Sequence, residues 1–433
     1  MAEEVTWVRR IAMPLTAPRI ADAVRSVDPA WDRWYCDSEA IMVRPMIDAK
    51  GMRQRRLLAK VRGVIESITE GDLHAKRVLS ISYATMGVIQ GAALGVTAIG
   101  RAMAIARGVE TKHAVKQVDR LLSNSAIDVW ELFSLWVPYA IGAKPEIVVS
   151  LDWTDYDHDG QATLALNMIT SHGRATPLMW LSVEKSELKG WRNAHEDRLL
   201  QRLREVVPDT VATTILADRG FGDTKLYALL WELKFDYVIR FRGVVKVTDE
   251  KGETRPAEGW VPPNGHTKTI RNAKVTHKKV HVPTIACTKA KGMKDSWCLA
   301  MGSSTRTGSE GVKLYGKRFT TEENFRDTKD IRFGMGLSQA RINSPERRDR
   351  ILLISALAVA MLTMLGAAGE SIGLDRYLKV NTDKRRTHSL FFQGCHYYAA
   401  MPMMPNADFR ALTVRFGELL REQQVTREVF ALI

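Results

Sequence analysis

Three strand-like runs separated by short turns constrain the fold of this chain more than any other feature. EIVVSLDW (146–153) is rich in β-branched residues, DYDHDG reads as a turn, and QATLALNMIT and ATPLMWLSVEK follow as the second and third runs. Strands this close together in a sequence pair as an antiparallel meander. A sheet is therefore expected to begin near residue 146.

The segments after this meander predict how the sheet continues. Trp191 to Val207 is helical in pattern, VATTILADRGFGD is an apolar run that ends at Asp218, a second helix passes through Tyr227 to Leu233, and FDYVIRFRG is another strand. A meander followed by helix, strand, helix and strand resembles the ribonuclease-H-like fold, where the first and fourth strands are adjacent. That arrangement would bring Asp152 and Asp218 to one edge of the sheet. Because an unpaired buried carboxylate is costly, an acid at such a strand end is more often functional than structural.

A third acid, Glu322, stands among residues suited to binding a phosphate. Tyr315, Arg318 and Lys329 lie at offsets of −7, −4 and +7 from it. If the segment is one helix, these side chains fall within about 60° of the glutamate. A carboxylate can hold a divalent cation and flanking cations can hold a phosphate. Two alternatives remain open: ordinary charge pairs on a solvated helix face, or a capping box that starts the helix at Thr320.

The charge balance points to a polyanionic partner. The chain has 63 Lys and Arg against 49 Asp and Glu, a formal net charge of +14. Such an excess suits nucleic acid and is uncommon among enzymes of small neutral substrates. Since 45% of the residues are hydrophobic, the chain is expected to fold and not to be a basic disordered tail.

The first 140 residues read as helical and contain two basic regions. The first is Lys50 to Arg62, with six basic and no acidic residues. The second, 94–124, predicts two helices joined at Arg107-Gly108, with Thr111 as N-cap, in the layout of a helix-turn-helix. The stripe expected to be buried consists of Val115, Val118, Leu121 and Leu122. The opposite face, expected to contact DNA, consists of Lys112, Lys116 and Arg120. Plain packing of a helical pair is the alternative.

Several metal and disulfide sites are excluded by spacing. The four cysteines form no C-x-x-C pair, so neither a disulfide framework nor a zinc finger is expected. Asp155, Asp157, Asp159 and Gly160 imitate the start of an EF-hand loop, but its twelfth position would be Leu166, where calcium needs a glutamate. Histidines occur singly, and none is assigned to a metal.

Ile351 to Gly369 is long and apolar enough to span a bilayer. Ser344-Pro345-Glu346 before it is a good start for a helix of a soluble protein, and a helix buried against a sheet is the preferred prediction. The N-terminal residues lack the apolar core of a signal peptide. A reducing cytoplasm is therefore expected.

The residues around the three acids identify a family. Tyr315, Arg318, Glu322 and Lys329 match the signature Y-x2-R-x3-E-x6-K without a gap. Supporting context comes from VSLDWTD, ILADRGF and RFGMGLSQAR. Between about residues 90 and 370 the chain resembles bacterial DDE-type insertion-sequence transposases of the insertion-sequence-four family, and its layout is most similar to that of the transposase of transposon ten.

This resemblance implies roles for individual residues. Asp152, Asp218 and Glu322 would be the catalytic triad and would hold two Mg²⁺ ions, for which Mn²⁺ can substitute. The side chains expected to contact DNA phosphates beside the scissile bond are Tyr315, Arg318 and Lys329, and Arg219 is also expected to bind DNA. Trp297 would stack on a base flipped out during hairpin formation; the alternative is a tryptophan in a strand core.

The resemblance also implies a function and a domain order. It predicts a helical DNA-binding domain over 1–140, a ribonuclease-H-like catalytic domain over 141–370 with a β-rich insertion at about 243–310, and a C-terminal helical tail over 371–433 that could dimerise. The protein would be a cut-and-paste transposase that acts as a homodimer on double-stranded transposon ends and target DNA. It would work in the bacterial cytoplasm, associated with the nucleoid, with no membrane partner. A nuclease without strand transfer and a catalytically silent DNA-binding repressor are the rival predictions.

Overall fold

The computed structural model describes residues 59–69, 73–330 and 334–426. Most of the basic segment from Lys50 to Arg62 lies outside these residues. The chain forms two compact units. Of the described residues, the first unit comprises 59–69, 73–129, 326–330, 334–342 and 346–425, and the second comprises 130–325, 343–345 and 426.

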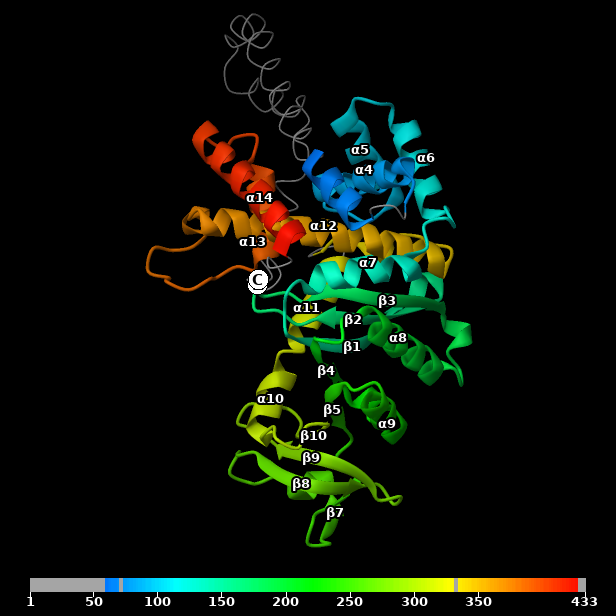
Figure 1. The fold of residues 1–433 in the computed structure, drawn as a ribbon, viewed down its shortest axis with the longest axis vertical. Helices are drawn as coiled ribbons and strands as arrows, with labels where there is room; N and C mark the ends of the chain where they lie inside the picture. The colour runs from blue at the N-terminus through cyan, green and yellow to red at the C-terminus, as the bar shows by residue number, and fades with distance from the viewer. Residues whose placement is uncertain (1–58, 70–72, 331–333, 427–433) are drawn as a thin grey trace, which may run out of the picture. The chain divides into compact units, whose positions relative to one another are not determined.

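The second unit is built on one sheet whose first five strands have the predicted order. These are β1 (Glu146–Tyr156), β2 (Gln161–Met168), β3 (Thr176–Glu184), β4 (Ala212–Ala217) and β5 (Asp236–Phe241). They lie in the order β3-β2-β1-β4-β5 (Figure 1). The meander is antiparallel, whereas β1 pairs with β4, and β4 with β5, in parallel. The α/β, ribonuclease-H-like prediction is confirmed, including the adjacency of the first and fourth strands.

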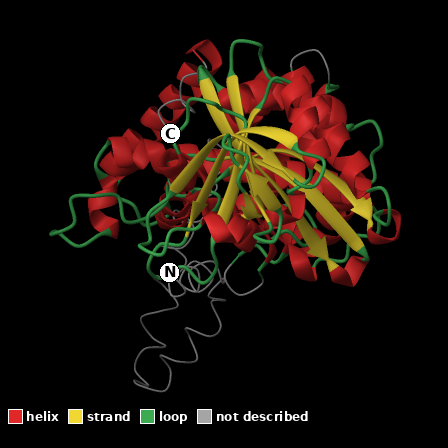
Figure 2. Ribbon diagram, turned by 90° about the horizontal axis from the view of Figure 1, so that it is seen from below, coloured by secondary structure: helices red, strands yellow, loops and turns green. Residues whose placement is uncertain are grey.

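The β-rich insertion extends the same sheet to ten strands. Its strands are β6 (Lys246–Thr248), β7 (Thr254–Pro256), β8 (Lys268–Val275), β9 (Val280–Thr288) and β10 (Trp297–Met301). The last of them, β10, pairs antiparallel with β5, and β9, β8, β6 and β7 follow outward. Figure 2 shows the strands fanned out by the twist of the sheet. Because the two strands are antiparallel, Cys298 near the start of β10 lies opposite Phe241 at the end of β5.

Helices of the second unit pack on this sheet through aromatic and apolar contacts. In α7 (Val129–Ile141), the ring of Phe133 meets that of Trp180 on β3 edge to face, with centroids 5.1 Å apart. The indole of Trp136 donates a hydrogen bond to the carbonyl of Pro177. Two further helices, α8 (Arg192–Val206) and α9 (Thr224–Glu232), contact β3 and β5. Every residue of β2 is consequently buried.

The segment that carries Glu322 is two helices and not one. α10 (Gly308–Gly316) and α11 (Phe319–Lys329) are separated by Lys317 and Arg318. The single-helix stripe is therefore wrong. The alternative start at Thr320 is off by one residue, since α11 begins at Phe319 and Arg318 precedes it, and the hydroxyl of Thr320 donates to the carbonyl of Lys317.

A capping box does occur nearby, at the start of α10. The hydroxyl of Thr307 accepts a hydrogen bond from the backbone of Glu310, and the glutamate side chain accepts one in return from the backbone of Thr307. This fixes where α10 begins.

The first unit is helical over its described residues. Its elements are α4 (Ala75–Gly91), α5 (Val96–Arg107), α6 (Thr111–Leu122), α12 (Pro345–Ser371), α13 (Leu390–Ala400) and α14 (Asn406–Thr426), with the last part of α11. The predicted pair α5 and α6 is joined through Gly108, which adopts a φ of 65°. Two details differ from the prediction. Thr111 is the first helical residue, and the N-cap is Glu110. Ala114 is buried, whereas Val115, expected in the buried stripe, is only partly buried and packs against Gly100 of α5.

The apolar segment forms a buried helix that begins at Pro345, as the sequence predicts. Among the described residues, α12 is the one unbroken helix with the length and hydropathy of a membrane span, and 89% of its apolar window is buried within the protein. The bent pair α4 and α5 would pass the same test only if it were counted as one span. Inside the first unit, Gly366 of α12 and Gly394 of α13 let the two helix backbones approach closely. Such burial is typical of a core helix.

Candidate active site

Asp152 and Asp218 are neighbours because of the strand register. In the parallel pair β1 and β4, Leu151 lies opposite Ala217, so each aspartate is the next residue on its strand path. Adjacent strands are about 4.8 Å apart. The carboxylate of Asp218 also accepts a hydrogen bond of 2.7 Å from the backbone N–H of Gly220, which holds the turn after β4. The two acids thus meet at one sheet edge, as predicted.

Arg318 links the third acid to the first. One guanidinium nitrogen lies 2.8 Å from Oδ2 of Asp152, and the other lies 2.7 Å from Oε1 of Glu322. Glu322 occupies the first turn of α11, and Arg318 immediately precedes that helix. The arginine side chain is only 11% exposed, and of its two partners Asp152 is 19% exposed and Glu322 50% exposed. Residues far apart in the sequence therefore form one cluster.

The electrostatics of Asp152 show that the three carboxylates sense one another. Its side chain is 19% exposed, and this burial raises its pKa to about 6. The positive charge of Arg318 opposes that rise, while the negative charges of Asp218 and Glu322 add to it. A cation placed among these carboxylates would relieve the repulsion.

The carboxylates are hard oxygen donors of the type that Mg²⁺ prefers. Among the residues that the structure describes, however, no three His, Cys, Asp or Glu side chains lie close enough together to hold a metal ion as they stand. The guanidinium of Arg318 lies between Asp152 and Glu322 and is bonded to both. The three carboxylates are suitable donors for a divalent cation by their chemistry.

The chain was compared with known proteins. Residues 188–361 match the family model of the transposase DDE domain. This match supports a DDE-type transposase, an enzyme that acts on DNA and generally uses divalent metal ions. The matched range contains Asp218 and Glu322 and begins after Asp152, which the β1–β4 register places beside Asp218. No curated protein sequence matches the chain.

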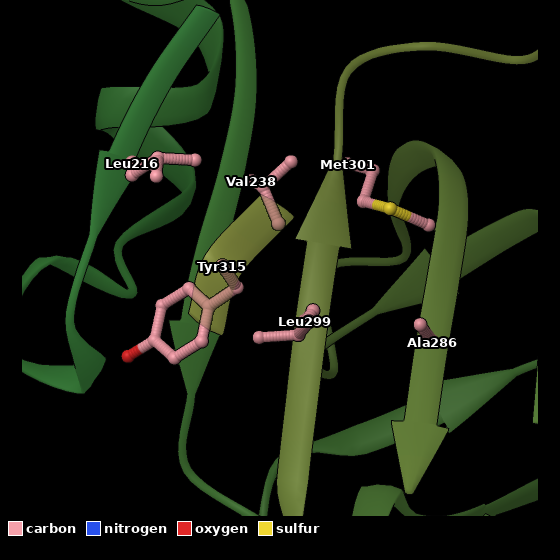
Figure 3. Close-up of a cluster of buried hydrophobic side chains, with 6 residues drawn as sticks. All are labelled: Leu216, Val238, Ala286, Leu299, Met301 and Tyr315. Atoms are coloured by element: carbon pink, nitrogen blue, oxygen red, sulfur yellow. The ribbon is translucent and has the colours of Figure 1, made fainter. Parts of the chain in front are cut away.

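Tyr315 lies deeper in the second unit than its predicted contact with phosphate suggests. Its ring belongs to a buried cluster with Leu216, Val238, Ala286, Leu299 and Met301 (Figure 3). Burial also raises the pKa of its phenol. A direct contact with DNA would therefore have to come through the hydroxyl at the ring's tip.

Trp297 packs against this cluster, with the ring of Phe319 beside it. The indole meets the Tyr315 ring edge to face at 4.9 Å and lies 6.3 Å from the ring of Phe319. Trp297 is partly exposed and Phe319 is 50% exposed. Trp297 is thus packed on one side and open on another, which is compatible with either a stacking or a structural role. Its stacking on a base stays a prediction.

The remaining residues predicted to contact DNA lie at separate places. Arg219 is exposed in the turn after β4. Lys329 is the last residue of α11 and belongs to the first unit. The exposed side chains on α6, also in the first unit, are Lys112, Lys116 and Arg120. All of these roles stay predictions.

The sequence analysis did not predict one buried carboxylate near the site. Glu196 of α8 accepts a 2.8 Å hydrogen bond from the indole of Trp153 and lies 3.4 Å from Arg192. Burial raises its pKa. Because strand residues alternate, Trp153 points to the face of the sheet opposite to that of Asp152. The hydrogen bond to Glu196 therefore anchors β1 on that opposite face. Trp153 and Glu196 are 43 residues apart, so no local sequence pattern predicts their contact.

The raised pKa of Asp152 predicts how stability depends on pH in EDTA. The unfolded chain releases this proton near about pH 3.9, whereas the folded chain holds it until about pH 6. As pH rises between these values, the contribution of Asp152 to the free energy of unfolding should fall by roughly 3 kcal/mol and then level off. Chemical denaturation of the wild type and of Asp152→Asn over pH 4–8 measures this. A constant difference between the two proteins would contradict the prediction.

Proposed function

We propose that this protein is a cut-and-paste DNA transposase of the insertion-sequence-four family, with a layout like that of the transposase of transposon ten. The observation that carries the proposal is the convergence of Asp152, Asp218 and Glu322, through the β1–β4 register and the double ion pair of Arg318. Hydrolysis of a phosphodiester needs concentrated negative ligands for metal ions, next to a positive group that accepts a phosphate. The cluster offers both.

The three acids would hold two Mg²⁺ ions, or Mn²⁺ in their place. When bound, such ions supply activation of water or of a 3′-hydroxyl and stabilisation of the leaving 3′-oxygen. Asp218 is oriented for this by its hydrogen bond from Gly220. Arg318, once released from the carboxylates, would hold a phosphate oxygen beside the scissile bond, with Arg219 and Lys329 as further contacts. The partly exposed Trp297 would stack on a base that leaves the duplex.

DNA is the proposed partner in the bacterial cytoplasm, at the nucleoid. The net charge of +14 favours binding to the phosphate backbone. The exposed row of α6 (Lys112, Lys116 and Arg120) gives a surface for this contact. We further propose that two copies pair two transposon ends, that the second strand is cut through a hairpin, and that the freed 3′ ends are joined to target DNA.

The test is an assay of the whole chain on a duplex that carries the inverted repeats flanking its gene, together with target plasmid. We expect nicked, hairpin and joined products in Mg²⁺ and none of them in EDTA. Cleavage without any joined product would favour the nuclease. Binding that persists in EDTA, with no cleavage in Mg²⁺, would favour the repressor. Either result would overturn the transposase.

A further inference from the structure

A buried hydroxyl pair joins the helix of Glu322 to the strand of Asp152. The hydroxyls of Thr321 and Ser150 lie 2.7 Å apart, and both residues are fully buried. Thr321 immediately precedes Glu322 in the sequence. Ser150 is two residues before Asp152, so the two share one face of β1. Each partner of this hydrogen bond is therefore next to an acid of the site.

A second polar contact lies beside the first. Asn167 of β2 is opposite Ser150 in the strand register, and its side-chain oxygen accepts a 3.3 Å hydrogen bond from the amide of Asn324. Thr321 and Asn324 are three residues apart on α11 and so lie on one helix face. Both asparagines are also buried. Two contacts from one helix face to two adjacent strands fix the sliding and the rotation of α11 on the sheet.

Apolar packing alone would position this helix less sharply. The first residue of α11, Phe319, is 50% exposed, and the break at Lys317 and Arg318 uncouples the helix from α10. Hydrogen bonds depend steeply on distance and angle, and inside a protein a lost partner leaves a costly unsatisfied group. Polar groups at these positions therefore favour a single placement of Glu322.

We propose that Ser150, Thr321, Asn167 and Asn324 form a polar clamp that positions Glu322 against Asp152. The four are positioning residues, since they act through the acids. This inference rests on the proposed function, because the alignment matters for catalysis only if both acids serve one reaction. A displacement of about 1 Å in an active site can lower a rate by about 10²-fold.

The experiment compares Thr321→Val with a matched control. Valine keeps the shape of threonine and removes the hydroxyl. Thr163 and Ser182 form a similar buried hydroxyl pair, 2.8 Å apart, between β2 and β3. Thr163→Val should lower the melting temperature about as much as Thr321→Val. We expect Thr321→Val to lower the rate of Mg²⁺-dependent cleavage by about 10- to 100-fold, and Thr163→Val to leave it nearly unchanged, at a temperature where both variants are folded.

Two further measurements separate positioning from general stability. Thr321→Ser keeps the hydroxyl and should recover most of the lost rate. The rise in melting temperature caused by Mg²⁺, which reports metal binding without catalysis, should shrink in Thr321→Val and persist in Thr163→Val. If Thr321→Val does not fold, Ser150→Ala takes its place with the same expectations.

Equal losses in Thr321→Val and Thr163→Val, or no recovery in Thr321→Ser, would overturn the clamp. Failure of the proposed function is a different result, in which the wild type itself cleaves nothing. In that case the Mg²⁺-dependent rise in melting temperature still decides the clamp, since it needs no DNA.

Discussion

Replacing any one of the three acids by its amide, as Asp152→Asn, Asp218→Asn or Glu322→Gln, should lower Mg²⁺-dependent cleavage by roughly 10³-fold or more. The amide keeps the size of the side chain and removes the charge that a divalent cation needs. The loss should be similar at each position, since two ions held by three acids leave none of the acids dispensable. The rate of cleavage of an end-bearing duplex measures it.

A surface acid of the same unit serves as the control for these variants. Asp209 is 97% exposed and pairs only with Arg204 among the ion pairs of the described residues. Asp209→Asn should therefore retain cleavage. The Glu322→Gln protein should fold, because its side chain is half exposed, and circular dichroism would verify this. A single amide variant that cleaves at the wild-type rate would remove that acid from the site.

The sequence predicts the sheet of this protein well because its signals are local. The turn DYDHDG and the β-branched runs beside it specify the meander within 40 residues, and the parallel strands follow helices of ordinary length. Asp218 directly follows β4, and Asp152 lies inside β1, which continues to Tyr156, so the order and register of these two strands bring the acids together. Local patterns were enough for two of the three acids.

Local sequence patterns did not predict the structure around Glu322. Tyr315, Arg318 and Glu322 have spacings that fit one helix, yet the chain breaks at Lys317 and Arg318. The break lets the guanidinium of Arg318 reach Asp152, which is 166 residues away in the sequence. That contact is tertiary, and helical periodicity carries no information about it. The contact overrides the helical pattern because two charge-assisted hydrogen bonds from one largely buried guanidinium outweigh a few residues of helix propensity.

The sequence also did not predict the buried hydrogen bond between Ser150 and Thr321. Ser150 in a strand and Thr321 in a polar helix look like ordinary solvent-facing residues, and only the docking of α11 on β1 buries them. On α6 the error was smaller. Val115 has the periodicity of a core position, but the structure leaves it partly exposed and buries Ala114 beside it.

Removing the charge of Arg318 should separate metal binding from catalysis. In Arg318→Met the side chain stays long and apolar and loses the guanidinium that pairs with two carboxylates. Without Mg²⁺ the variant should be less stable than the wild type, since like charges lose their counter-ion. With Mg²⁺ it should be stabilised at roughly tenfold lower concentration, because the guanidinium no longer competes for the same oxygens. Cleavage should still fall by roughly 10²-fold, since a phosphate contact is lost.

This result is decisive because the affinity for Mg²⁺ should rise in Arg318→Met while the rate of cleavage falls. Loss of fold would lower both, and loss of a contact made only with DNA would leave the Mg²⁺ titration unchanged. Arg318→Lys should behave much like the methionine variant in the titration, because an ammonium cannot span Asp152 and Glu322 as the planar guanidinium does. Arg204→Met, which removes an arginine paired with the exposed Asp209, should alter neither quantity. If melting temperatures measured over a range of Mg²⁺ concentrations coincide for the wild type and Arg318→Met, then Arg318 does not hold the place of the cation.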